Sequence, residues 1–485
     1  APTKEEDPDF SMYDARYSVI YWRPSTTQNA TGGQIVDPRS GEILKGEVNM
    51  YHNIMNLLTN WYFIQVGPLD ERAQTLPLPD DLMGRLVEYV VTHEIGHSIG
   101  MPHNMKASSQ YPADSVRSES FLRRMGHVST LMDYSRMNYV AQPEDNIPPE
   151  LLLPRIGPYD RFAVRWAYAP IPGAKTPEDE LETLNEWARE QDTKPWLRWT
   201  TSDSPNDPGA LTEAVGDEDA VYSSTLALKN LQRVMDMLVD VTEKEGKDYS
   251  QLEELYGQAV SQWGRYMGHV AAVVGGADTQ ERLGTGPRFK PVSRQRQEEA
   301  VQFLAENAFQ TPEMFSDVEI LSRIEAAGVL QRLRQSQSRV INTLLNKGRM
   351  DRLSEYEAFV DDPSSVYTAA DLMEDLREAI WSELDDRTVT VDVYRRNLQR
   401  AYLEGVERQL NPPAAGEGGG GGRRGGFGQA QQPRWESDQR PVLRGELLEL
   451  DALCEAAVER AGDAMTRLHL RDIRMEIERI LKGDE

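Results

Sequence analysis

The chain has 485 residues, more than one ordinary hydrophobic core accommodates, so we expect two or three domains. Its formal net charge of -26 would repel nucleic acid and anionic lipid surfaces, which excludes both as expected partners. No stretch approaches the roughly 18 to 20 consecutive apolar residues of a membrane-spanning helix, so we expect no transmembrane segment. The first residue, Ala1, fits either a mature form or a fragment. The single cysteine, Cys454, cannot form an internal disulfide and is predicted to be a small buried residue of a helix.

Short β-type stretches alternate with helical ones over the first 170 residues or so. RYSVIYW at 16–22 is rich in aromatic and β-branched residues and predicts a strand. IVDPRSGEILKGEVNMY at 35–51 contains a turn-like segment at 37–41 followed by further apolar residues. It predicts either a hairpin or a bent edge strand.

One long helix is predicted over residues 81–100, DLMGRLVEYVVTHEIGHSIG. The segment follows Pro79 and Asp80, carries apolar residues at helical spacing and reaches a glycine at Gly100. Glycine adopts the left-handed conformation that ends a helix and turns the chain sharply.

From about residue 175 onward the pattern is helical, as in VYSSTLALKNLQRVMDMLVDVTEKE at 221–245 and TAADLMEDLREAIWSELDD at 368–386. Residues 411–434 are too rich in Gly, Pro and Gln to pack, and they predict a flexible loop. The expected class is α+β, with a first domain of mixed strands and helices over 1–170 and an α-helical domain over 171–485 that this loop interrupts.

The predicted helix carries a metal-binding pattern. His93 and His97 are four residues apart, so their imidazoles lie on one face, with Glu94 beside them. The turn at Gly100 lets His103 return as a third ligand. Three imidazoles leave a fourth position open, which is the pattern of catalytic rather than structural zinc.

The expected cofactor is therefore one catalytic Zn²⁺ ion held by His93, His97 and His103. Zinc lowers the pKa of its bound water towards roughly 7, and Glu94 can take that proton and deliver it to the leaving amine. This chemistry predicts hydrolysis of peptide bonds. The alternative interpretation is a helix whose histidines are ordinary core or surface residues.

The sequence HEIGHSIGMPH resembles the metzincin clan, whose pattern HExxHxxGxxH it matches at all five positions. STLMDYSR at 129–136 resembles the Met-turn of that clan, with Met132 as the turn methionine. In several clan families a tyrosine two residues after this methionine ligates zinc or stabilises the transition state. The resemblance implies one of these roles for Tyr134.

Together with GPYDRFAVRWAY at 157–168, these motifs resemble a family of large bacterial zinc-dependent metalloproteases with flanking domains of unknown function. The resemblance implies a metzincin-like catalytic domain, a twisted mixed sheet plus an active-site helix, followed by a mostly α-helical region. Members of the family are exported, which implies an extracytoplasmic location. The clan pairs the substrate backbone with an edge strand, and we assign residues 41–50 to that strand.

Two hypotheses of function follow. The first is a zinc-dependent endopeptidase that acts on a protein or peptide, uses a zinc-activated water with Glu94 as general base, and has a helical half that covers the cleft or recruits substrates. The second is a zinc-stabilised, non-catalytic binding or scaffold module. Only the first requires Glu94 and an open cleft.

Overall fold

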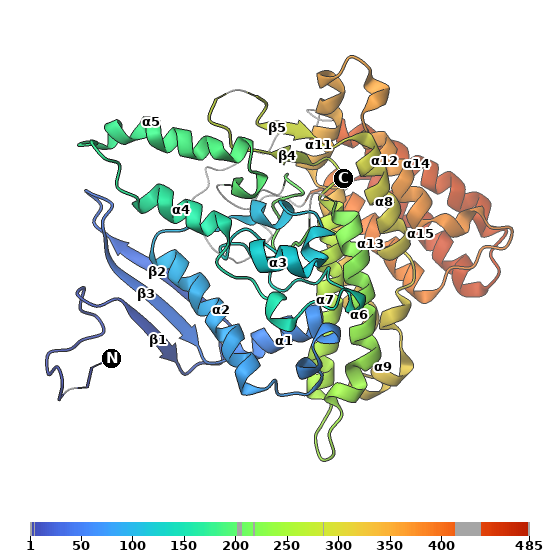
Figure 1. Ribbon diagram of the computed structural model, residues 1–485. Helices are drawn as coiled ribbons and strands as arrows, with labels where there is room; N and C mark the ends of the chain where they lie inside the picture. The colour runs from blue at the N-terminus through green and yellow to red at the C-terminus, as the bar shows by residue number, and fades with distance from the viewer. Residues whose placement is uncertain are drawn as a thin grey trace. The chain divides into compact units, whose positions relative to one another are not determined.

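The computed structural model describes residues 2–3, 5–200, 206–216, 219–284, 286–412 and 438–483 (Figure 1). The chain forms two compact units. The first comprises Ala1–Pro205, Gly209–Ala259 and Thr279–Phe289, and the second comprises Asn206–Pro208, Val260–Asp278 and Lys290–Glu485. The predicted boundary at residue 170 stays a prediction.

A three-stranded mixed sheet opens the first unit, with strands β1 (Val19–Arg23), β2 (Ala30–Val36) and β3 (Ile43–Tyr51) in the order β1-β3-β2. β1 lies parallel to β3 and β2 antiparallel to it, with an irregularity between Ile35 and Val36. Of the two alternatives for residues 35–51, the hairpin is correct. It turns through Gly41, whose φ is +76°, and the N–H of Asp37 donates to the carbonyl of Glu42.

The prediction that residues 41–50 form the edge strand is wrong. β3 is paired on both sides, and the antiparallel edge strand is β2. β2 carries Gly32 and Gly33, and glycine is depleted in strands, so the strand pattern of this segment is weak.

Helix α2 (Asp80–Ser98) packs against β2 and β3 (Figure 1). Buried apolar residues of α1 (Ile54–Val66) and α2, among them Leu58, Phe63, Leu82 and Leu86, belong to the core of this unit. The helices that lie wholly within the first unit are α1 (Ile54–Val66), α2 (Asp80–Ser98), α3 (Glu119–Met125), α4 (Pro158–Tyr168), α5 (Pro177–Ala188) and α6 (Ala220–Thr242).

The second unit is almost entirely helical. The chain passes into its main part within α7 (Ser250–Ala271). A short pair of strands follows, β4 (Ala277–Thr279) and β5 (Phe289–Pro291), of which Thr279 and Phe289 belong to the first unit. Cys454 is fully buried, as predicted. The remaining helices are α8 (Arg294–Asn307), α9 (Val318–Ile324), α10 (Val329–Leu344), α11 (Lys347–Tyr356), α12 (Ala369–Ile380), α13 (Val393–Leu410), α14 (Gln439–Val458) and α15 (Ala464–Lys482).

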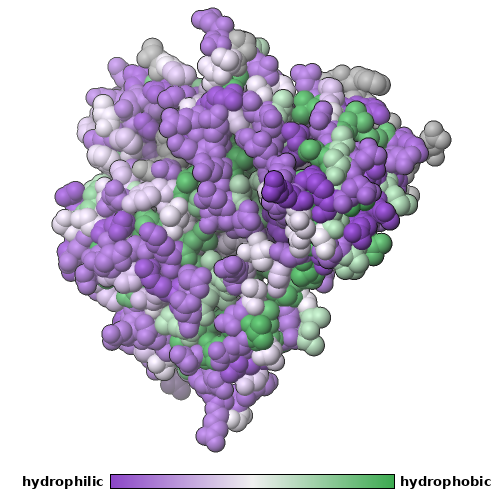
Figure 2. Space-filling model, turned by 90° about the vertical axis from the view of Figure 1, so that its right-hand side faces the viewer, coloured by the Kyte–Doolittle hydropathy of each residue, from purple (hydrophilic) through white to green (hydrophobic). Residues whose placement is uncertain are grey.

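The α+β class, with a mixed sheet and active-site helix followed by a mostly helical region, is confirmed. Among the described residues no helix is both long enough and apolar enough to cross a membrane. Hydrophilic side chains predominate on the face seen in Figure 2, in keeping with the high proportion of charged residues. The predicted flexible loop at 411–434 lies outside the described residues except for its first two.

Candidate metal centre and active site

Helix α2 carries the metal-binding pattern and ends where the sequence predicts. It begins after Pro79, with Asp80 and Asp81 in its first turn, where carboxylates favour the positive end of the helix dipole. At its end Gly100 has a φ of +89°. The N–H of Gly100 donates to the carbonyl of His97, and that of Met101 donates to the carbonyl of Gly96. This pair of hydrogen bonds is a Schellman motif, which turns the chain back towards the histidines.

Three histidine side chains converge on one point. The Nε2 atom of His103 lies 3.3 Å from that of His93 and 3.0 Å from that of His97. Tetrahedral zinc with Zn–N distances of about 2.0 to 2.1 Å needs nitrogens about 3.3 Å apart. Within the described ranges this is the one group of His, Cys, Asp and Glu side chains whose spacing suits a metal. The residues present therefore fit a zinc ion.

Backbone carbonyls orient two of these rings. The Nδ1 of His93 lies 2.5 Å from the carbonyl oxygen of Leu131, and the Nδ1 of His97 lies 2.9 Å from that of Met101. With the ring proton on Nδ1, each Nδ1–H donates to its carbonyl and Nε2 presents its lone pair. Such outer contacts fix the tautomer and orientation of metal-binding histidines.

Burial disfavours the protonated form of all three rings. Burial lowers the pKa of His93 to about 3 and that of His103 to about 4. Burial also lowers the pKa of His97. Neutral imidazole is the form that binds metal, so this unit presents a ligand set that is not protonated near neutral pH.

Glu94 lies beside the histidines and only 8% of its surface is exposed. Burial raises the pKa of its carboxyl to about 7, while the backbone N–H of Gly32 and the charge of Arg136 oppose the rise. A carboxyl that titrates near neutral pH is suited to taking and returning a proton. The contact with Gly32 also ties the carboxylate to edge strand β2.

The Met-turn residue Met132 is buried beneath the helix. A Cβ placed on Gly96 of α2 would lie 2.3 Å from the Sδ of Met132. The carbonyl of Met132 also accepts a hydrogen bond of 3.0 Å from the N–H of Asn104, the residue after His103. The turn therefore supports both the active-site helix and the third histidine.

This close approach gives a testable prediction for two glycines of α2. We expect Gly96→Ala to lower the free energy of unfolding by about 1 to 3 kcal/mol because the new methyl overpacks the Met132 contact. Gly84→Ala is the matched control, because it is exposed and its Cβ would meet nothing within 4 Å. It should raise stability by about 0.5 to 1 kcal/mol through helix propensity. Denaturant unfolding of both variants measures the difference, and equal effects would contradict the packing argument.

The buried side chain of Asp160 forms hydrogen bonds with residues of the Met-turn. Its carboxylate accepts hydrogen bonds from the Oγ of Thr130 at 2.5 Å and from the backbone N–H groups of Leu131 and Gly157 at 3.1 and 2.7 Å. Leu131 is the residue whose carbonyl faces His93. A buried carboxylate at the start of α4 thus fixes the residue whose carbonyl orients His93, one of the three candidate metal-binding histidines.

Tyr134 lies with its ring against the histidines. Its centroid is 4.2 Å from that of His103 and 5.3 Å from that of His93, in a stacked arrangement with the latter. Beside this group is a small cavity of about 50 Å³. Its lining consists of Asn29, Ala30, Ile54, Trp61, Tyr89, Val90, His93, Glu94, Tyr134 and Arg136.

The structure brings together every residue that the sequence singled out: His93, Glu94, His97, Gly100, His103, Met132 and Tyr134. Sequence reasoning missed Gly32, Asp160 and Arg136. Asp160 lies within the GPYD motif, where an acidic residue three positions after a glycine fits a helix cap and could have been noticed. No local pattern indicates Arg136.

Comparison with known protein families agrees with this geometry. The family model described as Met-zincin matches residues 75–388, well over half of the chain. No curated protein and no solved structure matches it. The matched segment contains the three histidines, the Met-turn and Asp160, and the chain belongs to the Met-zincin family, a family of metzincin-clan zinc metalloproteases.

Proposed function

We propose that this protein is a zinc-dependent endopeptidase. The observation that carries the proposal is the set of three histidines with Nε2 atoms at zinc-ligand spacing and with Glu94 beside them. A structural site would fill all four zinc positions with protein ligands, commonly cysteines, whereas this site offers three and has no cysteine near it in sequence. His93, His97 and His103 would hold the ion.

A bound zinc ion supplies Lewis acidity, which polarises a substrate carbonyl and makes water at the site more acidic. Glu94 acts as the general base: its carboxylate accepts the proton of the attacking water and then passes it to the nitrogen of the leaving amine. Its raised pKa suits both halves of this transfer. Tyr134, against His93 and His103, donates a hydrogen bond to the oxygen that gains charge as the carbonyl is attacked.

Strand β2 offers the place for an extended substrate. It is the antiparallel edge of the sheet, paired on one side with β3, and it packs against α2. Backbone groups along such an edge pair with a peptide without reading its side chains. The cavity beside Glu94 then receives one side chain next to the scissile bond. Its volume of about 50 Å³ suits a small side chain.

The substrate would be a protein or peptide. From the family resemblance we also propose an extracytoplasmic location. We also propose that the helical unit either covers the active-site cleft or recruits protein substrates.

The test is cleavage of an unfolded protein substrate by the purified chain, with zinc counted per chain. We expect one zinc per chain, cleavage that a chelator stops and added zinc restores, and cut sites flanked by small residues. Stoichiometric zinc with no cleavage would favour the scaffold alternative. Absence of bound zinc would overturn both hypotheses.

A further inference from the structure

Arg136 is held between two aromatic rings beside the candidate active site. Its guanidinium carbon lies 3.7 Å from the ring centroid of Trp61 and 4.3 Å from that of Tyr134. Both rings line the cavity next to Glu94. A guanidinium stacked on an aromatic face is attracted by the electrons of the ring, so this cation links Trp61 on α1 to Tyr134.

The backbone of Arg136 has an unusual conformation. Its φ is +60°, in the left-handed region that residues with a side chain seldom adopt. Within the described residues the only other non-glycine positions of this kind are Asn146 and Glu213, with φ values of +49° and +61°. Conformations of this kind persist only where the surrounding structure determines them, and they cluster at functional sites.

Glu213 is also the ion-pair partner of Arg136. The Oε1 of Glu213 lies 3.6 Å from the Nε of Arg136, and the two side chains are only 6% and 13% exposed. Two strained residues from distant parts of the chain therefore meet in one buried ion pair. A buried charge that loses its partner is strongly unfavourable, so each residue of the pair fixes the other.

The two segments that carry this pair are tied together independently of it. The backbone N–H of Val215 donates to the hydroxyl of Tyr139 at 2.9 Å. The side-chain amide of Asn230, on α6, donates to the carbonyls of Tyr139 and Ala141 at 2.9 and 2.7 Å.

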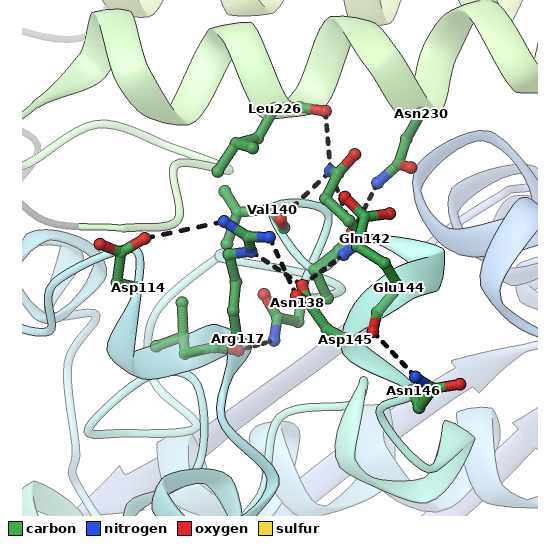
Figure 3. Close-up of polar contacts among 12 residues, drawn as sticks. Asp114, Arg117, Asn138, Val140, Gln142, Glu144, Asp145, Asn146, Leu226 and Asn230 are labelled. Carbon is green, nitrogen blue, oxygen red and sulfur yellow. Dashed lines mark hydrogen bonds and ion pairs between the residues drawn. The ribbon is translucent and has the colours of Figure 1, made fainter.

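Figure 3 shows further contacts of this segment. Gln142 donates to the carbonyl of Leu226 on α6, and Arg117 is paired with Asp145. The segment that follows the Met-turn is thus fixed to α6. This attachment places Arg136 in reach of the loop that carries Glu213.

We propose that Glu213 and Arg136 are positioning residues that hold the ring of Tyr134 at the metal site. Glu213 fixes the guanidinium, the guanidinium lies on the ring, and the ring lies against His93 and His103. A hydrogen-bond donor contributes most to catalysis when its orientation is set before the reaction, and this arrangement sets it from a residue 79 positions away in sequence. The inference rests on the proposed function, in which Tyr134 acts on the substrate.

The experiment compares Glu213→Gln, Tyr134→Phe and the double variant. Loss of one transition-state donor lowers kcat by about 100-fold or more, which we expect for Tyr134→Phe. We expect Glu213→Gln to lower kcat about tenfold, with KM changed less than about twofold. Because both act through the same ring, the double variant should be no slower than Tyr134→Phe alone. Additive losses, or an unchanged kcat in Glu213→Gln, would overturn the proposal.

A second measurement does not depend on activity. In the cobalt-substituted protein we expect Glu213→Gln to shift the visible absorption bands of the metal, because the ring of Tyr134 lies against His93 and His103. Arg136→Lys keeps the charge and loses the planar stack on the ring, so it should behave like Glu213→Gln. It takes the place of Glu213→Gln in both measurements if that variant does not fold. If the wild type cuts nothing, the proposed function fails. If the cobalt bands of both variants match those of the wild type, the positioning role fails.

Discussion

Glu94→Gln should reduce kcat by about 10² to 10⁴-fold, the contribution usual for a positioned general base. The amide cannot accept the proton of the attacking water, and it has the same shape as the carboxyl it replaces. Its oxygen can still face the N–H of Gly32, which lowers the pKa of the carboxyl in the wild type. The fold should therefore persist, and His93, His97 and His103 should still bind zinc.

Glu88→Gln is the matched control for this prediction. Glu88 lies on the same helix, its side chain is 60% exposed, and it pairs with Arg85 on the surface. We expect activity within a factor of two of the wild type, since exposed ion pairs contribute little. Steady-state kinetics on a cleaved peptide, with zinc content and thermal unfolding beside it, provide the measurement. Retention of more than a tenth of the activity by Glu94→Gln would remove the residue from the proposed mechanism.

The parts of the site that the sequence predicts are those that one helix and one turn determine. Spacing of four residues places His93 and His97 on one face of α2, and the glycine at 100 turns the chain so that His103 returns. These relations are local, so they can be read from the sequence. The α+β class likewise follows from the change of periodicity along the chain.

The parts that the sequence does not predict depend on approaches between distant segments. β3 has the stronger strand pattern, which favours its segment as the edge strand, although the edge strand that packs against α2 is the glycine-containing β2. A strong β pattern fits a central strand, which is paired on both sides, as readily as it fits an edge strand. The contact of Glu213 with Arg136 joins segments 77 residues apart, and a left-handed arginine has no signature in sequence.

Asp160 lies between these two cases. Its cap of α4 is local, and the capping pattern can be recognised from the spacing of Gly157 and Asp160. Its bond to the N–H of Leu131 is not local, because it joins α4 to the Met-turn. The sequence shows the acidic residue, and only the fold shows that it supports the carbonyl facing His93.

The glycines of β2 offer the sharpest test of how the sheet and the active-site helix fit together. Gly32 lies so close to α2 that an added Cβ would be 2.1 Å from the carbonyl oxygen of Glu94 and 2.9 Å from its Cα. Those are backbone atoms, which cannot move aside as the end of a side chain can. Gly32→Ala must therefore shift β2 away from the helix. We expect it to lose about 1 to 3 kcal/mol of stability, as overpacked sites do.

The same shift should impair catalysis more than it impairs folding. It removes the N–H of Gly32 from the Glu94 carboxylate and displaces the edge on which the substrate would lie, so we expect kcat/KM to fall at least 100-fold. Gly33→Ala is the control, because its Cβ would meet nothing within 4 Å. Glycine weakens a strand because it loses more conformational freedom on folding, so Gly33→Ala should leave stability unchanged or raise it by up to about 1 kcal/mol, with activity retained. Equal activities of the two variants would show that strand and helix are not in the close contact on which the substrate path depends.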